Sequence, residues 1–180
     1  DLDTKIWSVD GIPITENLNW HYDSGNGATT EPISLEMFWA TRVSSELTER
    51  ISVLTGDCAD VAKLWPNSER PPVDLVFIDA GHTYADVKRD FLAALNACTP
   101  NAMFVFDDYG DRSDYGVKKL VDQYLPLRVD SSEIQVIEFQ YDSAYDRSRD
   151  HKMAIWTPLG EARPEIFPLI HEPRPASHVL

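Results

Sequence analysis

Short apolar runs recur along the chain, and most of them are followed by a turn and then by a helical pattern. The strand-like runs cover residues 5–10, 51–54, 73–78, 102–106, 134–139 and 153–156. The run over 73–78 is almost continuously apolar, which is typical of a parallel strand covered on both faces. Residues 11–33, rich in Gly, Asn, Thr and Pro, show no sustained period, and we expect a long loop there with Trp20 and Tyr22 as part of a substrate lid.

Four helices are expected between the strands. Ser34 can cap the first helix, and Pro66 ends a short second one over 61–65. Thr83 and Asp86 form a capping box for the third helix. The apolar positions with helical spacing are Leu35, Phe38, Trp39, Val43 and Leu47 in the first helix, Tyr84, Val87, Phe91, Leu92, Leu95 and Cys98 in the third, and Val117, Leu120, Val121 and Tyr124 in the fourth.

This alternation of strands and helices predicts an α/β fold with a doubly wound, mostly parallel sheet. No helix is expected between the two late strands, so they should form an antiparallel pair at one edge. We expect one domain over residues 1–157 and an extended, proline-rich tail over 158–180.

Charge and composition narrow the classes of function. The 180 residues carry a formal net charge of −14, which disfavours nucleic acid as a partner. No apolar run approaches the roughly 20 residues that span a bilayer, so no membrane association is expected. The two cysteines, Cys58 and Cys98, fit no metal spacing and no disulfide framework, which favours a reducing, cytoplasmic location.

Acidic residues follow four of the predicted strands. They are Asp10, Asp57, Asp79 and the pair Asp107-Asp108. Ligands bind beyond the carboxyl ends of strands in open parallel sheets, where a cation could hold three repelling carboxylates together. The oxygen set of Asp79, Asp107 and Asp108 suits Mg²⁺, Mn²⁺ or Ca²⁺. Aspartates at strand ends also cap turns and helix starts, and the spacing alone weighs these two interpretations about evenly.

His82 stands at the start of the third predicted helix, three residues after Asp79. Near a metal, a neutral imidazole could act as a ligand, a base or a substrate contact. A local hydrogen bond at the helix start is an equally good interpretation of the spacing alone.

Residues 73–91, followed by Phe104-Val-Phe-Asp-Asp-Tyr109, resemble the class I S-adenosylmethionine-dependent methyltransferases. The resemblance is strongest to the branch that contains metal-dependent sugar O-methyltransferases, and it extends over roughly residues 5–157. It implies a Rossmann-like fold in which Asp10 holds the cofactor ribose. Gly56, Asp57 and Cys58 would surround the adenine, and Asp79 would also contribute to the cofactor site.

By the same resemblance, Asp79, Asp107 and Asp108 would hold a divalent ion, with Mg²⁺ as the expected metal. The ion would bind two oxygens of a small hydroxylated substrate, such as a sugar or glycoside, and aim one at the methyl group. Asp79 and His82 would be the catalytic residues.

The sequence departs from this family in two places. The family motif often reads Asp-Gly-Asp-His, with the second aspartate as proposed base, but that position is Gly81 here. His82 or a metal-bound hydroxide would then take the proton, or the chemistry differs. The family's first strand and Gly-rich loop should precede Lys5, where nothing fits them. We therefore expect a partial version of a longer methyltransferase, with a natural minimal domain as the alternative.

Two other functions compete with methyl transfer. A methyltransferase-like binding module without catalysis would explain Gly81 and the absent Gly-rich segment. A metal-dependent glycosyltransferase would also use an Asp-Asp pair after an apolar strand, but the segment from Asp79 to His82 favours methyl transfer. The sequence leaves open the methyl acceptor, and whether the protein forms a homo-oligomer.

Overall fold

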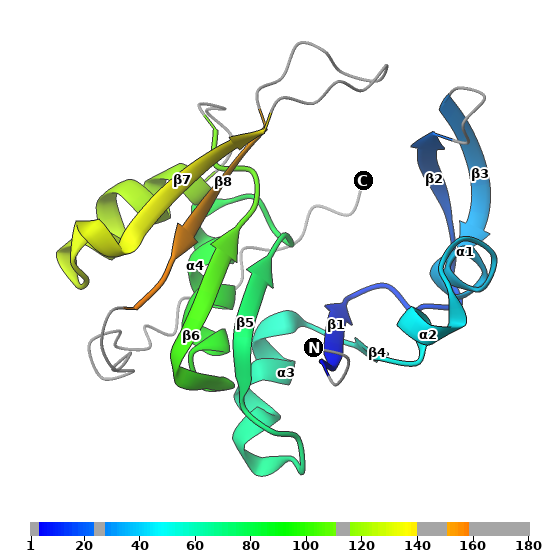
Figure 1. Cartoon of the computed structure of the whole chain (residues 1–180), viewed down its shortest axis with the longest axis horizontal. Coiled ribbons are helices and arrows are strands. Elements are labelled where there is room, and N and C mark those ends of the chain that lie inside the picture. Colours follow the sequence, from blue (N-terminus) through cyan, green and yellow to red (C-terminus); the bar gives the residue numbers. More distant parts are fainter. Residues whose placement is uncertain (1–3, 24–27, 111–115, 140–150, 159–180) are drawn as a thin grey trace. The chain divides into compact units, whose positions relative to one another are not determined.

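The structure is a computed structural model that describes residues 4–23, 28–110, 116–139 and 151–158. The chain divides into two compact units (Figure 1). The first unit comprises Asp1–Val61 with Asp142–Arg147, and the second comprises Ala62–Tyr141 with Ser148–Leu180. Each unit is described by itself.

Two small sheets form the first unit. Strand β1 (Ile6–Asp10) pairs in parallel with β4 (Ile51–Thr55), so that Asp10 lies opposite Thr55. Strands β2 (Asn17–Asp23) and β3 (Ala28–Ser34) form an antiparallel hairpin. The helices are α1 (Leu35–Arg42), α2 (Ser45–Thr48) and α3 (Cys58–Leu64), which begins in this unit.

The hairpin corrects the expected long loop over 11–33. Leu18, Trp20 and Tyr22 alternate with Asn19 and His21 along β2, and this period of two is the pattern of a strand. The pattern is short, and its Gly-rich and Pro-containing surroundings obscured it.

Helix α1 begins as expected and ends early. The Ser34 hydroxyl accepts a hydrogen bond from the Met37 amide at 3.2 Å, which caps the helix. Val43 takes an extended conformation, so the helix expected to reach Leu47 is divided into α1 and α2. No residue of α1 is buried.

A four-stranded sheet forms the second unit. Its order is β5 (Val73–Ile78), β6 (Cys98–Phe106), β8 (His151–Trp156) and β7 (Ile134–Phe139) (Figure 1). Strands β5 and β6 are parallel, whereas β8 is antiparallel to both of its neighbours. The α/β fold class and the antiparallel edge pair are therefore confirmed.

The core of this unit lies between one sheet face and its helices. The rings of Phe104, Phe106 and Trp156 lie 5.1 to 5.8 Å from that of Phe91, which belongs to α4 (Tyr84–Ala94). This spacing is typical of favourable aromatic pairs. Helix α5 (Val117–Lys119) continues through a π-helical turn, Leu120–Tyr124, into the 3-10 turn Leu125–Leu127. Further 3-10 turns cover Trp65–Asn67 and Ser131–Glu133.

Two details of the second unit differ from expectation. Leu75 and Phe77 of β5 are 58% and 52% exposed, so this strand is covered on one face rather than two within the part of the chain that the structure describes. Helix α4 ends at Ala94, and Cys98 begins β6 instead of continuing the helical face. A shift in register between Val73 and Leu75 accommodates the start of β6.

The described helices include none that is long and apolar enough to cross a membrane.

Candidate functional site

The carboxyl end of the β1–β4 pair brings together the predicted cofactor-binding residues of the first unit. The Gly56 amide donates to the Asp10 carbonyl at 2.8 Å, which continues the strand pairing. The Asp10 carboxylate accepts a hydrogen bond from the Ile12 amide at 2.9 Å. Gly56 has a φ of 156°, a conformation that a side chain would strain, so glycine is suited to this position.

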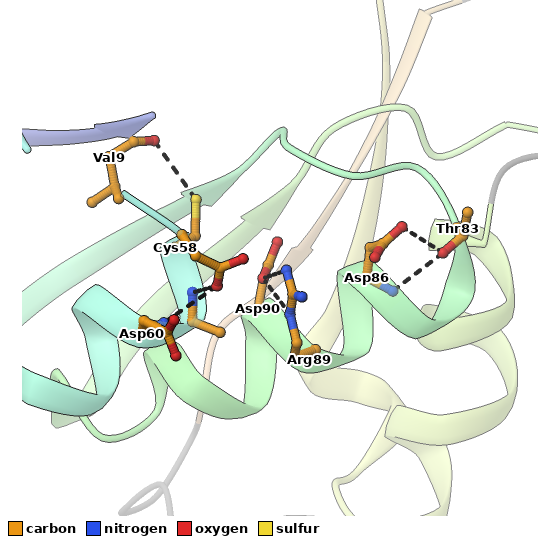
Figure 2. Close-up of polar contacts among 9 residues, drawn as sticks. Val9, Cys58, Asp60, Thr83, Asp86, Arg89 and Asp90 are labelled. Atoms are coloured by element: carbon orange, nitrogen blue, oxygen red, sulfur yellow. Dashed lines mark hydrogen bonds and ion pairs between the residues drawn. The ribbon is translucent and has the colours of Figure 1, made fainter. Parts of the chain in front are cut away.

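Asp57 directly precedes α3, which begins at Cys58 beside the same strand ends. One oxygen of Asp57 accepts hydrogen bonds from the amides of Ala59 and Asp60, at 3.0 and 3.3 Å. The Cys58 thiol donates to the Val9 carbonyl at 3.7 Å (Figure 2). Asp10 and Asp57 thus cap a turn and a helix start, which was the alternative to a ligand role. The two roles are compatible, because a carboxylate has about four acceptor positions.

These residues fit the cofactor that the sequence predicts for them. Carboxylates at two adjacent strand ends can accept hydrogen bonds from ribose hydroxyls and from an adenine amino group. The predicted roles of Asp10, Gly56, Asp57 and Cys58 remain predictions.

In the second unit, the acids at the ends of β5 and β6 are neighbours. The Asp107 amide donates to the Ile78 carbonyl at 3.0 Å, which extends the parallel pairing to Asp79 and Asp107. The next residue, Asp108, has a φ of 55°. This left-handed conformation is uncommon for a residue with a side chain, although aspartate adopts it more readily than most.

The side chain of Asp108 turns to His82. The His82 Nδ1 lies 3.2 Å from the Asp108 Oδ2, and the two side chains are 46% and 25% exposed. An ionised carboxylate can only accept, so this contact requires a proton on Nδ1. In the neutral imidazole, Nε2 is then unprotonated and able to accept a proton. The arrangement is that of a base oriented by an acid, as in hydrolase triads.

The predicted metal centre does not form as a group. The described residues contain no set of three or more His, Cys, Asp or Glu side chains that could hold a metal ion. Asp79 and Asp107 are neighbours along the sheet edge, but Asp108 is engaged with His82. Metal binding by Asp79, Asp107 and Asp108 remains a prediction.

Position 81 has a structural reason to be glycine. A Cβ built on Gly81 would lie 2.5 Å from the Cβ of Asp86. Asp86 is fixed there by the capping box: the Thr83 hydroxyl donates to its Oδ2 at 2.6 Å, and its amide donates to the Thr83 hydroxyl at 3.3 Å (Figure 2). The family's aspartate therefore cannot stand at position 81 on this backbone, and His82 is the next residue along the chain.

Sequence reasoning missed three residues around this site. The Gly116 amide donates to the His82 carbonyl at 2.6 Å, and a Cβ on Gly116 would overlap the backbone of Tyr84. The Tyr109 hydroxyl donates to Asp122 Oδ1 at 2.8 Å. A lone glycine before a helix could have indicated the close approach at Gly116. Nothing in the sequence connects Tyr109 with Asp122, since thirteen positions separate them.

The chain belongs to a methyltransferase-domain family, whose pattern it matches over residues 9–109, more than half of its length. The matched range contains each of the residues predicted here for cofactor, metal and catalysis. The fold is that of the class I S-adenosylmethionine-dependent methyltransferases, which confirms the resemblance noted from the sequence.

Two solved structures are similar to this chain. The O-methyltransferase TomG from Streptomyces achromogenes, involved in tomaymycin synthesis and solved with SAM, has a TM-score of 0.51 and 15% identity. The match covers 87% of this chain and 63% of TomG, so the chain spans less than two thirds of that relative. The O-methyltransferase NovP has a TM-score of 0.49 and 18% identity, over 87% of this chain and 60% of NovP. A comparison with curated protein sequences gives no match.

Proposed function

We propose that this protein transfers a methyl group from S-adenosylmethionine to a hydroxyl of a small molecule, and that His82 is the base. The observation that carries this proposal is the contact of 3.2 Å between His82 Nδ1 and Asp108, at the carboxyl end of the sheet in a methyltransferase-family chain. A sugar or glycoside is the acceptor class we favour, from the resemblance to sugar O-methyltransferases.

The first unit supplies the residues for the methyl donor. Asp10 accepts hydrogen bonds from the ribose hydroxyls, and Gly56, Asp57 and Cys58 accommodate the adenine. S-adenosylmethionine supplies the methyl group on a positively charged sulfur, which makes that carbon reactive toward oxygen nucleophiles. The net charge of −14 on the chain favours approach of such a cation.

The second unit supplies the base. Asp108 holds the proton on His82 Nδ1, so Nε2 can take the proton from the acceptor hydroxyl. The His82 side chain is 46% exposed, so the proposed base is not enclosed in the core. Asp108 also stabilises the imidazolium that forms when the proton is transferred.

Divalent-metal assistance remains a separate part of the proposal. The described side chains do not present a group of three ligands, so no step here depends on an ion. The test is a thermal-shift titration with Mg²⁺. An increase in melting temperature that Asp107→Asn abolishes would support the metal site, and an unchanged melting temperature would contradict it.

The test of methyl transfer uses S-adenosylmethionine with a labelled methyl group and a panel of glycosides and simple phenols. We expect transfer to at least one hydroxyl compound, and His82→Gln should lower the rate by about 10²- to 10⁴-fold, which is the usual contribution of a general base. Asp108→Asn should lower it less, because the imidazole remains but loses its fixed tautomer.

Asp130→Asn is the matched control for Asp108→Asn. Asp130 accepts a hydrogen bond from the Ser132 amide at 2.9 Å and belongs to no predicted site. We expect this control to keep the parent rate. Binding of the donor without transfer to any acceptor would favour the alternative of a catalytically inactive binding module. Full activity in His82→Gln would contradict the assigned base.

A further inference from the structure

Asp108 adopts its left-handed conformation between two fixed neighbours. On one side, the Asp107 amide bonds to β5 through the Ile78 carbonyl at 3.0 Å. On the other side, the Tyr109 amide donates to the Lys152 carbonyl of β8 at 2.9 Å. The backbone of residues 107–109 is therefore held by strands on both sides, and the Asp108 side chain is directed to His82.

The ring of Tyr109 adds a third attachment. Its hydroxyl donates to Asp122 Oδ1 at 2.8 Å, and the Lys118 Nζ lies 5.6 Å from the ring centre. Both partners belong to the segment formed by α5 and the following π-helical turn. This segment packs into the buried core through Val117, Leu120 and Val121, so it is a rigid support.

We propose that Tyr109 and Asp122 form a positioning pair that holds Asp108 in place and thereby keeps the His82 ring oriented with Nδ1 toward Asp108. The inference rests on the proposed function, because it assigns a role to two residues that serve the same base. Asp122 acts through Tyr109 and is a positioning residue, since nothing places it at the reacting atoms.

The geometry supports a role beyond local stability. Asp122 is exposed, and a hydrogen bond at an exposed site contributes little to the free energy of folding. The same bond fixes the residue next to one with a φ of 55°, a conformation that persists only where its surroundings determine it. Its loss should therefore change the orientation of Asp108 more than it changes the stability of the fold.

The experiment is ¹⁵N NMR of the full chain with ¹⁵N-labelled histidine at pH 8.5, with the His82 signals assigned by His82→Gln. Ring nitrogen shifts report which nitrogen carries the proton, and they require neither acceptor nor activity. In the parent protein, we expect His82 to be predominantly protonated on Nδ1. Asp108→Ala should give a mixture of the two tautomers.

Tyr109→Phe and Asp122→Ala should both move the His82 shifts at least halfway toward those of Asp108→Ala. Asp122→Asn should keep the parent shifts, because its amide oxygen can accept the same bond from Tyr109. Asp130→Ala is the matched control, and its His82 shifts should equal those of the parent. Melting temperatures are measured in parallel, and Tyr109→Phe removes a single oxygen, so the fold should survive this variant even if Asp122→Ala unfolds.

The outcomes separate the two proposals. A parent protein without a preferred His82 tautomer would contradict the assigned base and the positioning pair together. A parent with a fixed Nδ1 proton that is unchanged in both Tyr109→Phe and Asp122→Ala would overturn the positioning pair alone. If Asp122→Asn moves the His82 shifts as far as Asp122→Ala does, that result would also overturn the positioning pair.

Discussion

The two units of the chain bury their side chains to different degrees. In the second unit, Phe91, Phe104 and Phe106 have no exposed surface, and Trp156 is 1% exposed. In the first unit, among the residues whose burial the structure describes, only Ser34 is buried. Two-stranded sheets such as β1–β4 are marginally stable by themselves. The comparison indicates that the proposed base lies in a unit with a well-packed core. The predicted donor site lies in a unit with little buried surface, which ligand binding can stabilise.

The largest expected effect is a loss of stability when the core of the second unit is disrupted. Phe91→Ala removes a ring that contacts three other aromatic rings, and it should lower the free energy of unfolding by about 3–5 kcal/mol. Phe38→Ala makes the same change on α1, where the ring is half-buried, and should cost less than half as much. Urea unfolding followed by circular dichroism measures both. Equal costs for the two variants would contradict the difference between the units.

A smaller effect tests the loop that carries His82. Gly81→Ala introduces a Cβ beside Asp86 and should cost about 2 kcal/mol of stability, a usual figure for overpacking. Asp86→Gly removes the opposing Cβ and the capping contacts, and should cost about 1–2 kcal/mol by itself. The double variant should cost clearly less than the sum of the two. Additive costs would show that the two residues are not in contact.

The rates at which the two cysteines react with a thiol reagent can be compared directly between the units. Burial, with a smaller contribution from the negative charge of Asp74, raises the pKa of Cys98 to about 12. At pH 8 roughly one molecule in ten thousand then carries the reactive thiolate, so Cys98 should react very slowly with a disulfide reagent. Cys58, in the first unit, should react at least about tenfold faster than Cys98.

S-adenosylhomocysteine should slow the modification of Cys58, because we predict that this residue borders the adenine. The rate at Cys98 should not change, so it serves as the internal control. Mass spectrometry of the labelled peptides gives both rates. Equal protection of both cysteines would indicate a general tightening of the fold, and no protection of Cys58 would contradict its assignment to the donor site.

Local sequence signals predicted much of the second unit. The apolar run over 73–78, the capping box of Thr83 and Asp86, and the absence of a helix before the last strand each report on neighbouring residues, and the structure confirms the elements that they indicate. The placement of Asp79 next to Asp107 followed from the parallel pairing of successive strands.

Other features depend on contacts or dihedral angles that the sequence does not display. The contact between His82 and Asp108 depends on the left-handed backbone conformation of Asp108. The sequence does not show which residue adopts that conformation. The hydrogen bond from Tyr109 to Asp122 joins two elements whose packing is set by the core. The β2–β3 hairpin was missed because its alternation is brief and polar residues dominate it.

Calorimetric titration of S-adenosylhomocysteine into the 180-residue chain tests the central assignment most directly. We predict a Kd near 1 μM, equivalent to about −8 kcal/mol. Asp10→Asn should weaken binding at least about tenfold, because it removes a charge-assisted hydrogen bond, whereas His82→Gln should bind as the parent does. No binding by the parent, or equal binding by Asp10→Asn, would contradict the account of the donor site.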